Sequence, residues 1–274
     1  MKSKLKNARL VALDLDGTVL RSDNTLSPAM RSALESLIKS GVEVAVASGR
    51  PFGTIHPDIM KIEGLRYLIT SNGAAVYESG KRVFSRTMDG GDVAALMKLT
   101  EPYDLIWEAF RDGEIYTDSR YYSDPVRYGC GEAYIEYVRS SRGHRSDMRN
   151  YIIENRNRLD EVEFVCTDDR LRNYLWDEIA AKLTNLHITS SSRNFVELMD
   201  KKATKSNGLR WLCERLGIDL RDTAAAGNAD NDVDMLKAAG IGIAVKNASE
   251  KCLAAADIIV AANDEDGLAE VFPV

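Results

Sequence analysis

The feature that most constrains the fold is an apolar run that ends at two carboxylates. Residues 10–13 read Leu-Val-Ala-Leu, and Asp14-Leu15-Asp16-Gly17 follows directly. A continuous apolar run is typical of a strand in a parallel sheet, because both faces of such a sheet are covered. Alternate side chains of a strand point the same way, so Asp14 and Asp16 are expected to face one side. Gly17 then permits a backbone turn that a side chain would obstruct.

The two acids lie where an open α/β sheet binds its ligands, at the carboxyl end of a strand. Two carboxylates this close repel each other, and a hard divalent cation with oxygen ligands neutralises them. Asp-Leu-Asp-Gly is also a common strand-ending turn, and a motif this short also occurs by chance. The pair therefore predicts a ligand site only if other strand ends supply further groups.

A strand-helix-strand unit follows the two acids. Ser27-Pro28 has the pattern of a helix N-cap with proline in the first turn, and Gly41 follows the last apolar position as a helix stop. Residues 42–47 form a second β-rich run that ends at Ser48-Gly49-Arg50-Pro51, and residues 68–74 form a third. A unit of this length predicts parallel strands joined by a right-handed crossover. Their carboxyl ends are therefore expected at one edge of the sheet.

The pattern changes from about Thr87. Strand-like residues 103–110 and 114–117 flank Asp112-Gly113, a strong hairpin signal. Residues 119–149 are rich in Tyr, Arg, Ser and Gly with weak periodicity, and a strand, a helix and a strand are expected at 161–167, 171–183 and 186–190. This succession predicts an inserted α+β domain at 87–190, between core segments 1–86 and 191–274.

The parallel-sheet pattern is expected to resume after Phe195. A helix that stops at Gly217 precedes the small-residue strand 223–226, which ends at Gly227-Asn228-Ala229-Asp230-Asn231-Asp232. A short helix at 233–239 and strands at 241–245 and near 255–260 follow. The whole chain predicts an α/β fold: a Rossmann-like parallel sheet with helices on both faces, plus the inserted α+β cap domain.

Charge and composition exclude several function classes. The 274 residues carry a formal net charge of -6 with a pI near 5.3, which argues against a protein that coats nucleic acid or an anionic membrane. No run approaches the roughly 20 apolar residues that span a bilayer, and residues 1–6 do not resemble a secretory signal. The sequence thus predicts a cytoplasmic protein with a small-molecule partner, and it leaves the oligomeric state open. Its scattered cysteines favour reduced thiols over zinc or disulfides: Cys130, Cys166, Cys213 and Cys252.

Four polar loops are predicted to meet at one edge of the sheet. They carry the first two acids, Ser48, Lys205 and the cluster 228–232. Each loop alone has a simpler explanation: Ser48-Gly49 as a turn, Lys201, Lys202 and Lys205 as a solvated basic patch, and the Asn/Asp cluster as a helix cap. Their occurrence together, in order and at strand ends, favours a site.

This succession of motifs resembles the haloacid dehalogenase (HAD) superfamily over nearly the whole chain, and in particular the Cof-like phosphatases with a large inserted cap of the C2B type (HAD-IIB). The resemblance implies that Asp14 is the nucleophile and Asp16 the general acid/base. It also implies a Mg²⁺ cofactor. The residues implied to bind phosphate are Leu15 (through its backbone amide), Ser48, Gly49, Lys205 and Asn231, and those implied to bind the metal are Asp14, Asp16, Asn228 and Asp232.

One position departs from the family pattern. The family usually has an aspartate after Gly227 as a magnesium ligand, and this chain has Asn228. An amide oxygen coordinates a hard cation without adding negative charge. We therefore expect weaker metal binding, partly offset by Asp232, with Asp230 a less suitable substitute.

The resemblance implies a Mg²⁺-dependent phosphatase that hydrolyses a small phosphorylated metabolite, such as a sugar phosphate, through an aspartyl-phosphate. A phosphomutase would use the same intermediate, and a weakened metal site would suit a phosphate-ligand binding or regulatory protein. A receiver-like phosphorylation domain is disfavoured by the large insertion. Several Tyr and Arg side chains of the cap suit a polar substrate but equally suit a solvated surface: Tyr121, Tyr122, Arg127, Tyr128 and Arg139. We assign none of them to substrate binding.

Overall fold

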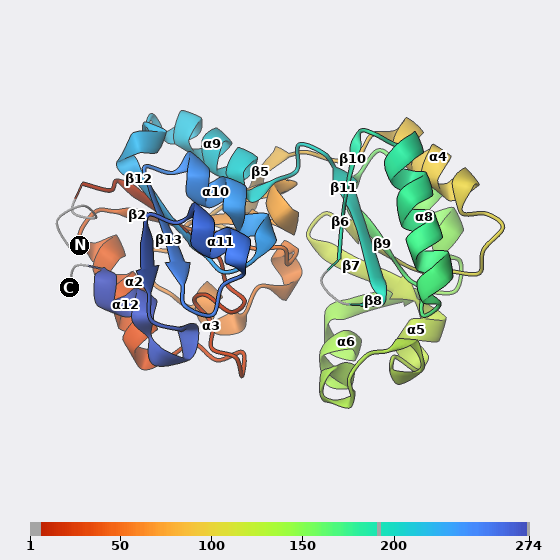
Figure 1. Ribbon diagram of the computed structural model, residues 1–274, viewed down its shortest axis with the longest axis horizontal. Coiled ribbons are helices and arrows are strands. Elements are labelled where there is room, and N and C mark those ends of the chain that lie inside the picture. Colours follow the sequence, from red (N-terminus) through yellow and green to blue (C-terminus); the bar gives the residue numbers. More distant parts are fainter. Residues whose placement is uncertain (1–6, 191–192, 273–274) are drawn as a thin grey trace. The chain divides into compact units, whose positions relative to one another are not determined.

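Two units, each built on its own sheet, make up the computed structural model, which describes residues 7–190 and 193–272 (Figure 1). The first unit comprises the chain up to Arg50, Ile55–Phe84 and the chain from Thr204 onward. The second comprises Pro51–Thr54 and Ser85–Ala203. No helix among these described residues is long and apolar enough to cross a membrane.

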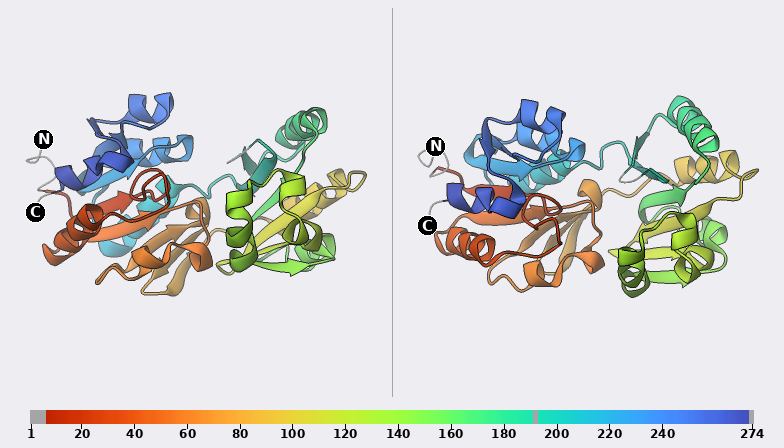
Figure 2. Two further views of the ribbon diagram at one scale, coloured as in Figure 1. Left: turned by 90° about the horizontal axis from the view of Figure 1, so that it is seen from below. Right: turned by 60° about the horizontal axis from the view of Figure 1, so that its bottom comes forward.

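The first unit has an eight-stranded sheet in the order β14-β13-β12-β1-β2-β3-β4-β5. Six neighbouring strands are parallel, and β4 runs antiparallel to β3. Strands β1 and β12 lie side by side although they are far apart in the sequence (Figure 2). The bounds are β1 Leu10–Leu13, β2 Glu43–Ala47, β3 Tyr67–Thr70, β4 Ala75–Glu78, β5 Lys81–Ser85, β12 Thr223–Gly227, β13 Ile241–Val245 and β14 Ile258–Val260.

Helices cover both faces of this sheet, which confirms the predicted α/β class. Helix α2 (Pro28–Lys39) begins as predicted, with the Ser27 hydroxyl accepting from the Met30 amide and proline in the first turn. Helix α9 (Lys205–Leu216) ends at Gly217 in the left-handed region. Apolar side chains of α9 and of α10 (Val233–Ala238) share one buried core with the sheet, and Leu209, Leu236 and Leu10 are among its members. The remaining helices are α3 Pro57–Met60, α11 Glu250–Ala255 and α12 Gly267–Val271.

The second unit has a six-stranded sheet in the order β10-β11-β9-β6-β7-β8. The predicted hairpin at Asp112-Gly113 is confirmed, because β6 and β7 pair antiparallel and both turn residues have positive φ. The strands are β6 Ile106–Arg111, β7 Glu114–Asp118, β8 Arg142–Arg145, β9 Leu159–Val165, β10 Leu186–Thr189 and β11 Phe195–Asp200. The main helices are α4 Gly90–Leu99, α5 Ser119–Ser123, α6 Ile135–Ser141, α7 Met148–Glu154 and α8 Asp169–Lys182.

Helices pack on both faces of this second sheet. Residues of α4, α7 and α8 form one core with Trp107 and Phe164. Tyr121 of α5 and Val138 of α6 cover the other face at Ile106. Residues 119–149 therefore hold α5, α6, β8 and the start of α7, although their apolar periodicity is weak.

The chain returns to the first unit later than the sequence pattern indicates. The expected start of the second core segment, residue 191, lies outside the described residues. Strand β11, which lies where the parallel-sheet pattern is expected to resume, is antiparallel to both β9 and β10 in the second unit. Val196 and Leu198 of β11 are buried in the core of that unit, and the first unit resumes at Thr204.

Candidate active site

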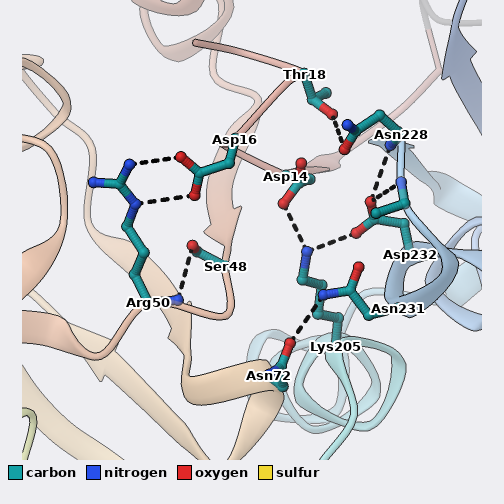
Figure 3. A network of polar contacts seen from close by, with 11 residues as sticks. Asp14, Asp16, Thr18, Ser48, Arg50, Asn72, Lys205, Asn228, Asn231 and Asp232 are labelled. Atoms are coloured by element: carbon teal, nitrogen blue, oxygen red, sulfur yellow. Dashed lines mark hydrogen bonds and ion pairs between the residues drawn. The ribbon is translucent and has the colours of Figure 1, made fainter. Parts of the chain in front are cut away.

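The predicted residues converge at the carboxyl ends of three parallel strands and at the start of α9 (Figure 3). Asp14 follows β1, Ser48 follows β2, and Asp232 lies at the end of the loop that follows β12. Lys205 is the first residue of α9 and faces these loops. All of these residues belong to the first unit. The strand-end geometry inferred from the sequence is therefore present in the structure.

The Lys205 ammonium lies buried between two carboxylates. Its Nζ donates to Asp14 Oδ1 at 2.6 Å and to Asp232 Oδ1 at 2.7 Å. Burial alone would lower the pKa of Lys205, but the two aspartates raise it above its usual value. Lys205 therefore remains a cation, and the buried trio of two acids and one base carries a net negative charge when both acids are ionised. A second cation would offset that remaining charge.

The nucleophile candidate Asp14 is almost fully buried and repelled by a neighbour. Burial and the charge of Asp232 raise the pKa of Asp14 to about 7, against the opposing effect of Lys205. Its second oxygen, Oδ2, is buried without a hydrogen-bond partner among the described residues. A buried carboxylate oxygen without a partner is costly, and it suits a metal ion or an incoming phosphorus atom.

The loop that carries Asn228 is held by Asp232. Oδ2 of Asp232 accepts from the backbone amides of Asn228 and Ala229, both at 2.9 Å. Because its Oδ1 accepts from Lys205, both carboxylate oxygens of Asp232 contact protein donors. Asn228 Oδ1 accepts from the Thr18 hydroxyl at 3.2 Å, which places this amide beside the loop that follows Asp16. The ligand role predicted for Asp232 remains a prediction, and its contacts favour support of Lys205 and of the Asn228 loop.

Asp16 is held by an arginine to which the sequence analysis gave no role. Arg50 Nε donates to Asp16 Oδ2 at 2.9 Å, and its Nη2 donates to Asp16 Oδ1 at 2.6 Å. Nη2 also donates to Asn24 Oδ1 at 2.8 Å. A bidentate guanidinium fixes both the position and the plane of a carboxylate. The only sequence signal for this pair is that Arg50 follows Ser48-Gly49.

The other predicted phosphate-binding residues line the same loops. Ser48 is fully buried, and its hydroxyl accepts from the Arg50 amide at 3.1 Å. The Leu15 carbonyl accepts from the amides of residues 18, 19 and 20, which fixes the turn after Asp14. Asn231 is exposed, and its Nδ2 donates to Asn72 Oδ1 at 3.0 Å. Asn72 is a second residue to which the sequence gave no role.

Asp230 makes its contacts elsewhere. Its two carboxylate oxygens accept from the Ser249 hydroxyl at 2.7 Å and from Lys251 Nζ at 2.6 Å. The ion pair with Lys251 lowers the pKa of Asp230. These contacts agree with the expectation that Asp230 is a poor substitute for an aspartate at position 228.

The cap side chains that were left unassigned serve partly in the packing of their own unit. Tyr121 is buried against Ile106 and Val165. Tyr122 stacks on His144 with ring centroids 4.2 Å apart, and Arg139 Nη2 donates to the Ser123 carbonyl at 3.0 Å. We therefore still assign none of these residues to substrate binding.

The side chains labelled around Asp14 in Figure 3 offer oxygen and nitrogen atoms to a ligand. No group of three or more His, Cys, Asp or Glu side chains suited to a metal occurs within residues 7–190 and 193–272. Mg²⁺ does not need such a cage, because it typically takes one or two carboxylates and keeps waters and substrate phosphate as its other ligands. The oxygens of Asp14 and Asn228 fit that cation.

Known proteins resemble this chain over nearly its full length. A sequence profile of the haloacid dehalogenase-like hydrolases matches residues 11–272. Phosphatase YwpJ of Bacillus subtilis (strain 168) is 29% identical, with 96% of this chain and 98% of that protein covered. A crystal structure of a haloacid dehalogenase-like hydrolase from Bacteroides thetaiotaomicron superposes with a TM-score of 0.82 at 26% identity, covering 97% of this chain and 98% of that one.

A third protein shares the fold over nearly the whole chain. The HAD subclass IIB sugar phosphatase BT4131 superposes with a TM-score of 0.78 at 21% identity, covering 96% of this chain and 97% of that one. The fold, the order of the motifs and the profile match agree. The chain therefore belongs to the haloacid dehalogenase-like hydrolases, as its motifs predict.

Proposed function

We propose that the protein is a Mg²⁺-dependent phosphatase that hydrolyses a small phosphorylated metabolite in the cytoplasm through an aspartyl-phosphate intermediate. The observation that carries the proposal is the buried Asp14, with one oxygen paired to Lys205 and the other without a partner. A sugar phosphate or a similar phosphomonoester is the substrate class that we propose. Relatives named as phosphatases support this activity, YwpJ among them.

The residues that would hold Mg²⁺ are Asp14 and Asn228. Asp16 and Asp232 remain predicted ligands, Asp16 through an oxygen that it does not use for proton transfer. Bound there, the cation would neutralise phosphoryl oxygens and the remaining negative charge of the site. Because Asn228 contributes no charge, we expect the affinity for Mg²⁺ to be lower than with a carboxylate at that position.

Asp14 would act as the nucleophile. An oxygen of Asp14 would form a bond to phosphorus while the bond from phosphorus to the leaving oxygen breaks, which gives an aspartyl-phosphate. A phosphate dianion repels a carboxylate, so the attack needs positive charge around the phosphoryl oxygens. Lys205 has three N–H groups and uses two of them on Asp14 and Asp232, which leaves the third for a phosphoryl oxygen. The Ser48 hydroxyl, the amides of Leu15 and Gly49, and Asn231 would complete the contacts.

Asp16 would move the protons in both half-reactions. As an acid it would give a proton to the leaving alkoxide, and as a base it would then take one from the water that attacks the aspartyl-phosphate. Water attack releases inorganic phosphate and restores Asp14. To reach the leaving group, the Asp16 carboxylate would have to break its two hydrogen bonds with Arg50. This ion pair would therefore belong to the protein without substrate.

The direct test is release of inorganic phosphate from p-nitrophenyl phosphate and from a panel of phosphorylated metabolites, with and without Mg²⁺. We expect phosphate release that requires Mg²⁺ and is abolished by EDTA. A single strong substrate would identify the metabolite, and a flat profile would indicate a generalist. Isomerised substrate without free phosphate would instead indicate a phosphomutase, and binding without turnover at saturating Mg²⁺ would indicate a regulatory protein.

Replacing Asn228 by Asp is expected to lower the Mg²⁺ concentration for half-maximal activity by about tenfold, because a carboxylate adds a full negative charge beside the cation. The substitution preserves the shape of the side chain, and the oxygen that accepts from Thr18 is retained. The measurement is a Mg²⁺ titration of phosphate release.

Asn207→Asp is the matched control for this titration. The substitution adds the same charge on the exposed surface of α9. It leaves the backbone amide of residue 207, which donates to the helix cap Thr204, in place. Its titration curve should coincide with that of the wild type. A curve for Asn228→Asp that also coincides would remove residue 228 from the metal site.

A further inference from the structure

The turn Ser71-Asn72-Gly73 after β3 has an unusual backbone. All three residues lie in the left-handed region, with φ of 48°, 52° and 96°. Two of them are not glycine, and such conformations persist only where the surroundings hold them. Strained turns of this kind cluster at functional sites. The contacts of this turn show what it serves.

Two of the proposed phosphate-binding segments touch the backbone of this turn. The amides of Ser71 and Asn72 donate to the carbonyls of Arg50 at 3.0 Å and Ser48 at 3.1 Å. On its other side, Gly73 packs so closely against the start of α9 that an added Cβ would lie 2.1 Å from the Thr204 carbonyl oxygen. The turn thus joins the Ser48 loop to the residue that precedes Lys205.

The Asn72 side chain adds a third connection (Figure 3). Its Oδ1 accepts from Asn231 Nδ2 at 3.0 Å. The same amide lies over Gly49, where an added Cβ would be 3.3 Å from Oδ1 and 3.4 Å from Nδ2. Asn72 therefore contacts two predicted phosphate-binding residues that come from different strand ends.

We propose that Asn72 is a positioning residue of the phosphate site, which acts by orienting the Asn231 amide. The proposal rests on the proposed function, because it takes Asn231 as a phosphate ligand. A carboxamide has two N–H groups and one carbonyl oxygen. When one N–H is donated to Asn72, the other can be donated to a phosphoryl oxygen. Without that acceptor the Asn231 amide can rotate and turn its carbonyl oxygen toward the anion, which repels it.

Asn72→Gly tests the role of the Asn72 side chain separately from the role of the backbone turn. Glycine adopts a φ of 52° without strain, so the turn is retained while the amide is lost. We expect inorganic phosphate to bind about 5- to 10-fold more weakly by titration calorimetry, as for the loss of one charge-assisted hydrogen bond. The kcat/KM for p-nitrophenyl phosphate should fall by a similar factor. The midpoint of thermal unfolding should not fall.

Ser71→Gly is the matched control. It places a glycine in the same turn at a φ of 48°, and the hydroxyl that it removes has no hydrogen-bond partner among the described residues. Its phosphate affinity should stay within about twofold of the wild type. A loss as large as that of Asn72→Gly would assign the effect to flexibility of the turn and overturn the proposal.

A double-mutant cycle with Asn231→Ala tests whether Asn72 acts through Asn231. If Asn72 acts through Asn231, then adding Asn72→Gly to Asn231→Ala changes phosphate affinity no further. Additive losses would overturn the proposal. Wild-type protein that binds phosphate but does not hydrolyse the esters would refute the proposed function and leave the Asn72 test valid. Wild-type protein that does not bind phosphate at all would refute both.

Discussion

Replacing Asp14 by Asn is expected to lower Mg²⁺-dependent phosphate release by at least about 10⁴-fold, the size of loss that follows removal of a covalent nucleophile. An amide oxygen does not displace an alkoxide from phosphorus. The wild type should form an acid-stable, hydroxylamine-labile phosphoprotein during turnover, and Asp14→Asn should not. Assays of phosphate release and of the quenched protein measure both outcomes.

The fold should survive this substitution. The Asn oxygen can still accept from Lys205, and repulsion by Asp232 disappears. We therefore expect an equal or higher midpoint of thermal unfolding, as when a functional site gives up unfavourable charge. Asp23→Asn is the control, because Asp23 lies exposed in the following loop and accepts from Thr25. Normal turnover by Asp14→Asn would eliminate Asp14 as the nucleophile.

Replacing Lys205 by Met should remove both activity and stability. Loss of a donor to the phosphoryl oxygens is expected to lower kcat by at least about 10³-fold. Asp14 and Asp232 would also lose the buried cation that both of them contact. Breaking a buried ion pair by removing one partner costs about 3–5 kcal/mol of unfolding free energy. Phosphate release and denaturant unfolding measure the two effects.

The stability loss of Lys205→Met should depend on pH. Without Lys205, the folded-state pKa of Asp14 rises further above the value of about 7 that it has in the wild type. The folded variant then keeps a proton that the unfolded chain has released above about pH 4, so its stability falls as pH rises toward the new folded-state pKa. The gap from the wild type should therefore widen above pH 7.

Lys202→Met is the control for this substitution, because Lys202 is an exposed lysine three residues earlier. Its stability and activity should match those of the wild type at every pH. A Lys205→Met variant that is as stable as the wild type at pH 9 would show that the two acids do not depend on this cation.

Much of the fold could be predicted because the pattern of the first unit is local. The run at Leu10–Leu13, the cap at Ser27 and the stop at Gly217 each specify one element, and the structure contains all three elements. The segment that contains β11 was assigned to the core because a six-residue stretch does not specify the strands that it pairs with. Its pairing with β9 and β10 depends on packing that no local pattern records.

In the candidate site too, some residues could be predicted from the sequence and others could not. Acids, amides and a lysine at the ends of predicted parallel strands were sufficient to name Asp14, Lys205 and Asp232, which the structure brings into contact. The roles of Arg50 and Asn72 were not predictable. The role of Arg50 depends on its side chain pointing toward Asp16, and that of Asn72 on its side chain pointing toward Asn231. Sequence spacing does not determine these directions.

The sequence by itself determined the chemistry that this chain can offer: which strand ends carry acids and amides, and that a lysine precedes the helix between them. Only the tertiary structure decided how those groups are paired. Burial makes an unpaired charge costly, so the folded chain places Lys205 between Asp14 and Asp232 and leaves one Asp14 oxygen without a partner. Pairing of this kind arises from groups that lie up to 191 positions apart in the chain. It exists only once the sheet has brought them together.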